Sequence, residues 1–175
     1  MQQVSESASL PEESLLCAYR DQGAYTDCFT LDAPFVISHA EYVTAFYTSR
    51  LFKVERAILK WALAMPSTDD QAAQLAAGSP DNFAAWRVEG RSENQLLLCD
   101  YQGRTRSWLM TEPISIDGKP ATRLCFGSAV VPVIDRKSGK MTMSMGFRLL
   151  LGFHRLYARA LLSSAGRKLA GPEGD

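Results

Sequence analysis

The strongest evidence for the fold is the segment FAAWRVEGRSENQLLLCDYQGRTRSWLMTEPISIDGKPATRLCFGSAVVPVI, from Phe83 to Ile134. Its apolar residues recur with the period of two that is typical of β-strands. Turn signals interrupt it, and the strongest is Asp117–Gly118, a dipeptide that favours a tight hairpin turn. The segment therefore predicts a run of antiparallel strands, beginning at residue 83 and continuing over residues 95–101, 104–114 and 122–133.

A strand and two helices are expected before this segment. Residues 24–31 (AYTDCFTL) are rich in aromatic residues and threonine, which favour a strand. Ser38 and Glu41 form the S-x-x-E pattern of a capping box and predict the start of a long helix that ends near Ala64, before Pro66. A shorter helix follows, with Ser67 as its expected cap.

A long amphipathic helix is expected at the end of the chain, from Gly146 to Lys168. Its basic stripe is formed by Arg148, Arg155 and Arg159. A solvated face is the simpler interpretation of this stripe, and association with a membrane surface is the alternative. Residues 141–143 are compatible with a short edge strand, so the sequence predicts five or six strands.

These patterns together predict an α+β protein. Its antiparallel sheet would wrap around the long C-terminal helix, with two helices inserted after the first strand. Residues 1–14 are expected to be a flexible N-terminal tail. Residues 15–170 would form a single ligand-binding-like domain, and residues 171–175 a C-terminal tail.

The composition is that of a globular protein, and its expected reduced cysteines would fit a cytoplasmic location. The chain has 175 residues, of which 46% are hydrophobic and 22% charged, and its 19 basic residues balance its 19 acidic ones. A net charge of zero disfavours a nucleic-acid partner. No stretch has the length of a transmembrane helix, and no signal peptide is expected.

The four cysteines do not suggest a metal site. Cys17, Cys28, Cys99 and Cys125 form no C-x-x-C pair and have no histidine at ligand spacing, so we expect reduced thiols and no metal or other cofactor. The sequence also has no hydrolase, P-loop or dinucleotide-binding motif.

Strand residues 104–110 (RTRSWLM) are the most informative candidates for a site. Alternation places Arg106, Trp108 and Met110 on one face. A buried arginine requires an anion, which could be Asp100 or Glu89 on a neighbouring strand, or the carboxylate or phosphate of a ligand.

The closing helix adds two further candidates beside its apolar face, His154 and Tyr157. An ordinary helix histidine is the simpler interpretation of His154. The alternative is a general base or a ligand contact.

The order of elements resembles the helix-grip fold of the START and Bet v1-like superfamily, also called SRPBCC. Within it, GRTRSWL at residues 103–109, TRLCFGSAVVP at 122–132 and GFHRLYARALL at 152–162 look like an uncharacterised bacterial family of unknown function. The resemblance covers about residues 24–162 and implies no catalytic residues. The superfamily usually has seven strands, whereas this sequence predicts five or six.

Three functions are compatible with these features. The leading hypothesis is a binding module that holds an apolar or amphipathic small molecule between the sheet and the C-terminal helix, through Arg106, Trp108, Met110, His154 and Tyr157. The second is a cyclase, dehydratase or isomerase whose acid or base is Asp100, Glu89, Tyr101 or His154. The third is an interaction protein that pairs with itself through an exposed helix, forming a homodimer.

Overall fold

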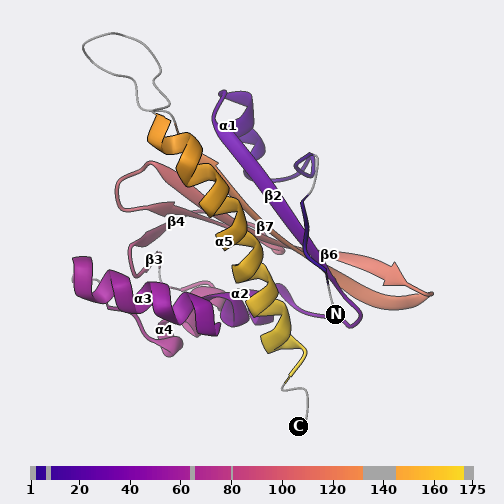
Figure 1. The fold of residues 1–175 in the computed structure, drawn as a ribbon. Coiled ribbons are helices and arrows are strands. Elements are labelled where there is room, and N and C mark those ends of the chain that lie inside the picture. The colour runs from indigo at the N-terminus through magenta and orange to yellow at the C-terminus, as the bar shows by residue number, and fades with distance from the viewer. Residues whose placement is uncertain (1–2, 7–8, 64–65, 80, 132–144, 172–175) are drawn as a thin grey trace.

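A computed structural model of the chain has an α+β architecture with one antiparallel sheet (Figure 1). It describes residues 3–6, 9–63, 66–79, 81–131 and 145–171, without the side chains of 55, 58–60, 62, 63 and 145–154. The elements in chain order are β1 (Ser5–Glu6), α1 (Cys17–Asp21), β2 (Tyr25–Ala33), α2 (His39–Tyr47), α3 (Arg50–Leu63), α4 (Asp69–Ala76), β3 (Asn82–Phe83), β4 (Trp86–Arg91), β5 (Gln95–Asp100), β6 (Thr105–Ile116), β7 (Lys119–Val130) and α5 (Met145–Leu169).

The sheet has seven strands in the order β1-β2-β7-β6-β5-β4-β3. The hairpin predicted at Asp117–Gly118 is confirmed: both residues have positive φ, +50° and +75°, and they join the long strands β6 and β7. The strand count exceeds the prediction because β1 and β3 have only two residues each, too few to show alternation. The possible edge strand at residues 141–143 lies outside the described residues.

The long helix predicted from Ser38 is divided into α2 and α3. The capping box at its start is confirmed, since Ser38 and Glu41 bond reciprocally. The break falls at Thr48 and Ser49. The Thr48 hydroxyl donates to the Thr44 carbonyl at 2.6 Å, and the Ser49 hydroxyl accepts from the Phe52 amide at 3.3 Å. These side chains offer the backbone alternatives to continuous helical bonding, so the helix ends and restarts.

The next helix, α4, begins one residue later than predicted. Its N-cap is Thr68, whose side chain accepts from the Gln71 amide while Gln71 reaches back to the Thr68 amide. Ser67 instead accepts a bond from Arg56 on α3 at 2.9 Å. Thr68 therefore forms the complete capping box, which Ser67 does not.

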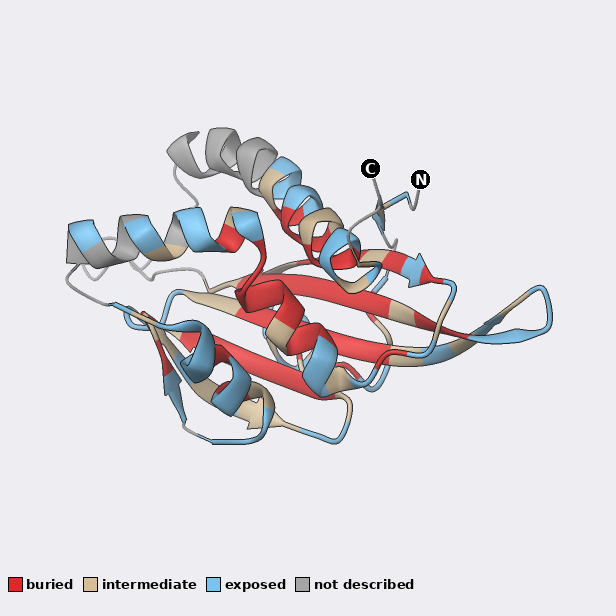
Figure 2. Cartoon of the chain, turned by 90° about the horizontal axis from the view of Figure 1, so that it is seen from below, coloured by how far each residue is buried: buried red, intermediate tan, exposed pale blue. Residues whose placement is uncertain are grey.

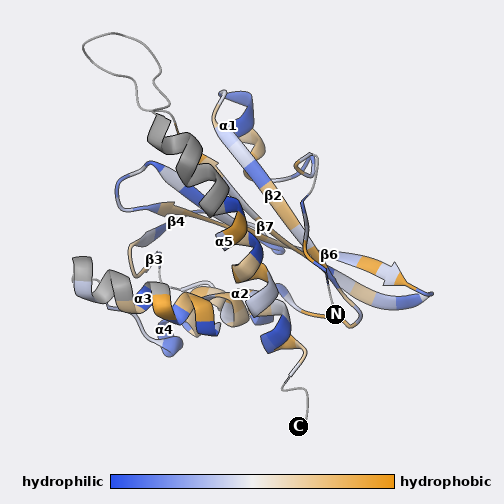
Figure 3. Ribbon diagram, in the orientation of Figure 1, coloured by the Kyte–Doolittle hydropathy of each residue, from blue (hydrophilic) through white to orange (hydrophobic). Residues whose placement is uncertain are grey.

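One face of the sheet is covered by helices. α2, α4 and α5 pack on it and form the larger core, in which Phe29, Leu109 and Phe126 of the central strands meet Phe46 of α2 and Leu162 of α5. Figure 2 shows the buried residues concentrated in these central strands and in α2. Hydrophobic residues, orange in Figure 3, recur along the same elements.

The opposite face is covered by the N-terminal segment. Leu10 and Leu16 are buried there against Cys28, Trp108 and Met110. The chain before residue 15, predicted to be a flexible tail, thus contributes an edge strand, β1, and buried side chains. No helix among the described residues is long and apolar enough to cross a membrane.

Candidate functional site

Trp108 and Met110 lie on the same face of β6, as alternation predicted, but this face is turned away from α5. Both pack in the second core beneath the N-terminal segment. The indole of Trp108 is fully buried, and its Nε1–H donates to Gln95 Oε1 at 2.9 Å. The sequence predicted the shared face correctly and assigned it to the wrong side of the sheet.

Arg106 lies on that same face, and its positive charge is neutralised by a carboxylate of the same chain. Its Nε is 2.8 Å from Glu89 Oε2 and donates to the Tyr19 hydroxyl at 2.9 Å. The guanidinium carbon lies 4.7 Å from the centre of the Tyr19 ring. Glu89, one of the two carboxylates expected as a partner, is therefore the one that pairs with Arg106.

The two candidates on the closing helix lie on the other side of the sheet. Tyr157 is half-buried against the helix-side core. The side chain of His154 lies outside the described part of the chain. The predicted site residues are thus divided between the two faces, with Arg106, Trp108 and Met110 separated from α5 by the sheet.

The three residues considered as a catalytic acid or base, Glu89, Asp100 and Tyr101, have structural partners or lie at the surface. Glu89 pairs with Arg106. Asp100 Oδ1 accepts from the amides of Arg104 and Thr105, at 2.7 and 3.1 Å, and so closes the turn between β5 and β6. Tyr101, on the same turn, is 52% exposed.

A polar cluster that the sequence analysis did not identify lies on the helix-covered face. Phe29, two residues from Asp27 on β2, belongs to the core under α5, so Asp27 points to the same side. The strand register places Asp27 opposite Ser128 on β7, and Ser128 opposite Ser107 on β6. With Tyr25, the next residue of this face on β2, these three form what we call the Asp27 cluster.

The cluster is buried except for Tyr25, which is half-buried, and Asp27 is bonded to both Ser128 and Tyr25. Asp27 is 7% exposed, and both serines are also buried. Asp27 Oδ1 accepts from the Ser128 hydroxyl at 2.6 Å and from the Ser128 amide at 3.0 Å. The Tyr25 hydroxyl donates to Asp27 Oδ2 at 3.4 Å. A buried carboxylate is stabilised by such bonds and is costly to bury without them.

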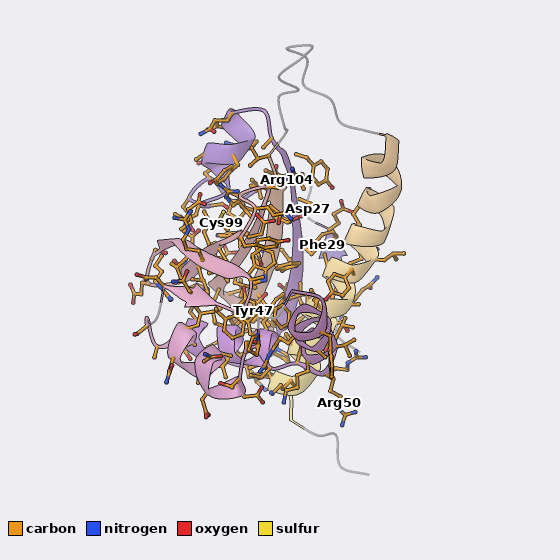
Figure 4. The ribbon with its side chains drawn as sticks, turned by 90° about the vertical axis from the view of Figure 1, so that its left-hand side faces the viewer. Asp27, Phe29, Tyr47, Arg50, Cys99 and Arg104 are labelled. Carbon is orange, nitrogen blue, oxygen red and sulfur yellow. The ribbon has the colours of Figure 1, made fainter. Side chains whose placement is uncertain are left out.

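Charges around the cluster come from α5 and from the sheet. Burial, together with the negative charge of Asp27, raises the pKa of Tyr25 to about 12, so the phenol stays protonated and remains a donor. Arg155 of α5 pairs with Glu6 on β1 and lies close enough to Tyr25 to oppose this shift. In Figure 4, Asp27 and Phe29 lie on the side of β2 that faces α5.

The cluster can bind a hydrogen-bond donor or a cation, because its centre is a carboxylate, and the two hydroxyl groups can also accept. The sequence contains the signal for it. Asp27 shares the parity of Phe29 and Leu31 in AYTDCFTL, which places a charge on the apolar face of a predicted strand.

Among the described residues, no group of three or more His, Cys, Asp or Glu side chains could hold a metal ion. Comparison of the chain with protein-family models and with curated proteins finds no match.

Proposed function

We propose that the protein binds a small amphipathic molecule between the helix-covered face of the sheet and α5. The observation behind this proposal is the Asp27 cluster, in which a buried carboxylate and two buried serines lie beside the apolar core that the sheet forms with the helices. Ligand sites in proteins are commonly apolar surfaces with a few convergent polar groups. The arrangement of Asp27 beside Phe29 matches that description.

The chemistry of the cluster indicates the polar end of the ligand. Asp27 is a hydrogen-bond acceptor, and Tyr25 keeps its proton. An amine or a hydroxyl would bond to the carboxylate, whereas a carboxylate ligand would be repelled. The apolar part of the molecule would lie along Phe29 toward Tyr157, which packs against the same core.

Membership of the SRPBCC superfamily, in a bacterial family of unknown function, is part of this proposal. The order of strand, helices, antiparallel strands and C-terminal helix supports it. A cytoplasmic location is also proposed, and the four free cysteines support it, because reduced thiols are usual in that compartment.

The test compares three twelve-carbon probes by titration calorimetry, below their micelle concentrations: dodecylamine, dodecanol and dodecanoate. We expect dodecylamine and dodecanol to bind and dodecanoate to bind least. In the variant D27N, the affinity for dodecylamine should fall about tenfold or more, because a hydrogen bond to a charged group contributes about 1.5–3 kcal/mol.

The matched control is D32N on the same strand. Asp32 points to solvent and pairs with Arg123 at 2.7 Å, so its loss should not change binding. Thermal unfolding of both variants checks that they are folded. Absence of binding by all three probes, or equal binding by the wild-type protein and D27N, would overturn the proposal.

A second function, self-association through an exposed helix, is favoured by α3. Trp61 is 86% exposed, and Val54, seven residues earlier on the same helical face, is exposed as well. Light scattering after size exclusion should then give a concentration-dependent dimer that the variant W61S lacks. A wild-type monomer at high concentration would eliminate this alternative.

A further inference from the structure

Two cysteines from neighbouring strands lie together beneath the N-terminal segment. Cys28 on β2 and Cys125 on β7 are both buried in the second core, at 2% and 0% exposure. The strand register places Cys28 opposite Gly127 and Cys125 opposite Thr30, so the two cysteines are diagonal neighbours on one face of the sheet. This face is the one turned away from the Asp27 cluster.

The two thiols interact directly. The S–H group of Cys125 donates a hydrogen bond to the sulfur of Cys28. This bond lowers the pKa of Cys28 against the opposite effect of burial, and the same bond, together with burial, raises the pKa of Cys125. Because the thiolate is the reactive form of cysteine, Cys28 is the nucleophile of the pair, and Cys125 is placed to react with its oxidised product.

The other two cysteines have different surroundings and serve as internal comparisons. The thiol of Cys17 on α1 donates to the Pro11 carbonyl at 3.3 Å. The thiol of Cys99 on β5 donates to the Asp100 carbonyl at 3.3 Å, and burial raises its pKa. Each of these thiols is therefore bonded to the backbone, whereas Cys28 and Cys125 are bonded to each other.

The diagonal arrangement suits a reversible disulfide. Diagonal neighbours in an antiparallel sheet are about 7–8 Å apart, whereas a disulfide usually joins Cα atoms about 4.4–6.8 Å apart. A bond between Cys28 and Cys125 therefore requires the two strands to move slightly toward each other. A disulfide strained in this way is easily reduced, which is the behaviour of regulatory disulfides in a compartment that keeps thiols reduced.

The N-terminal segment covers the pair. Leu16 Cδ1 lies 2.8 Å from the position that a Cβ atom would take at Gly127, the residue opposite Cys28, so this leucine lies directly over the site. Gln95 holds the segment, because its side chain bonds to the backbone of residues 13 and 15. An oxidant therefore reaches the thiols when this segment opens.

We propose that Cys28 and Cys125 are a redox-active pair, which a hydroperoxide oxidises to a disulfide when the N-terminal segment opens. The Cys28 thiolate attacks one oxygen of hydrogen peroxide, the O–O bond breaks, and the leaving hydroxide takes the proton that Cys28 released and becomes water. Cys28 is then a sulfenic acid. The Cys125 sulfur attacks the Cys28 sulfur, the S–O bond breaks, and hydroxide leaves with the proton of Cys125 as a second water. Each sulfur loses one electron, and the two peroxide oxygens gain both.

The sequence makes this reaction easy to follow, because trypsin places the four cysteines in four different peptides, residues 1–20, 21–50, 92–104 and 124–136. After exposure to hydrogen peroxide, the remaining thiols are alkylated under denaturing conditions and the peptides are analysed by mass spectrometry. We expect a disulfide between peptides 21–50 and 124–136 that dithiothreitol reverses, while Cys99 stays alkylated. Absence of this cross-link, or oxidation of Cys99 before the pair, would overturn the proposal.

Three variants separate the roles of the thiols. C125S leaves the sulfenic acid of Cys28 without a partner, so dimedone should label peptide 21–50 more strongly than in the wild-type protein. C28S should leave Cys125 reduced, because the nucleophile is missing. C99S is the matched control and should form the disulfide at the wild-type rate. Equal dimedone labelling of Cys28 in C125S and in the wild-type protein would contradict the role of Cys125.

The variant Q95L tests the control of access. It removes the bonds that hold the N-terminal segment, so the segment opens more often and the disulfide should form about tenfold or more faster than in the wild-type protein. Q102L, which replaces an exposed glutamine, should leave the rate unchanged. The reaction is followed below the unfolding transition of each variant. Equal rates in Q95L and the wild-type protein would overturn the proposal, whatever the outcome with dodecylamine, since the Asp27 cluster lies on the other face of the sheet.

Discussion

Gln95 connects the central sheet to the N-terminal segment, and its replacement by leucine tests how that segment is held. Gln95 Oε1 accepts from Trp108 Nε1 at 2.9 Å and from the Leu15 amide at 3.0 Å, and its Nε2 donates to the Glu13 carbonyl at 3.0 Å. Leucine fills a similar volume and makes none of these bonds. At about 1 kcal/mol for each, the free energy of unfolding should fall by about 3 kcal/mol.

Urea denaturation of Q95L measures this change. A loss of that size corresponds to a decrease in Tm of about 6–12 °C for a chain of this length. Limited proteolysis should also cut residues 10–19 faster than in the wild-type protein. The control is Q102L: Gln102 is exposed, so its replacement should change the free energy of unfolding by less than about 0.5 kcal/mol.

A double-mutant cycle isolates one of the three bonds. W108F removes the indole donor, so adding Q95L in that background should cost about 1 kcal/mol less than it does alone. The reasoning fails if the free energy of unfolding of Q95L lies within about 1 kcal/mol of the wild-type value. It also fails if Q95L lowers the free energy of unfolding by the same amount in the wild-type and W108F backgrounds, because Gln95 would then not hold the N-terminal segment.

Two further predictions concern packing and pH. At Gly127, a Cβ atom would lie 2.8 Å from Leu16 Cδ1 and 2.9 Å from Trp108 Cε3, so G127A should lower the free energy of unfolding by about 1–3 kcal/mol in urea titrations, and an unchanged midpoint would contradict this packing. Burial, with a smaller effect of Arg91, lowers the pKa of His39 in the folded protein. Between the lowered folded-state pKa of His39 and about pH 6.5, the unfolded chain therefore binds a proton that the folded chain does not, and in this range stability should fall with decreasing pH by at most about 1.4 kcal/mol per unit. This part of the pH dependence should be absent in H39Q, and identical profiles for the two proteins would refute the assignment.

Most of the elements were predictable because their signals are local. The capping box at Ser38 and the turn at Asp117–Gly118 depend on residues within a few positions, and both were confirmed. The break at Thr48 was missed because helical periodicity continues across it, while the competing bond is made by one side chain. The candidate site was predicted less well, since Trp108 and Asp27 owe their surroundings to distant segments.

Which residues share a face of each strand could be predicted from the sequence alone, because alternation is a property of the extended backbone. Alternation therefore grouped Arg106 with Trp108 and Met110 correctly. Which of the two faces meets α5 depends on the tertiary packing. Both faces of the central strands are apolar, so the pattern is the same for either choice, and burial of Leu10 and Leu16 on one side leaves the other, with Asp27, to the helices.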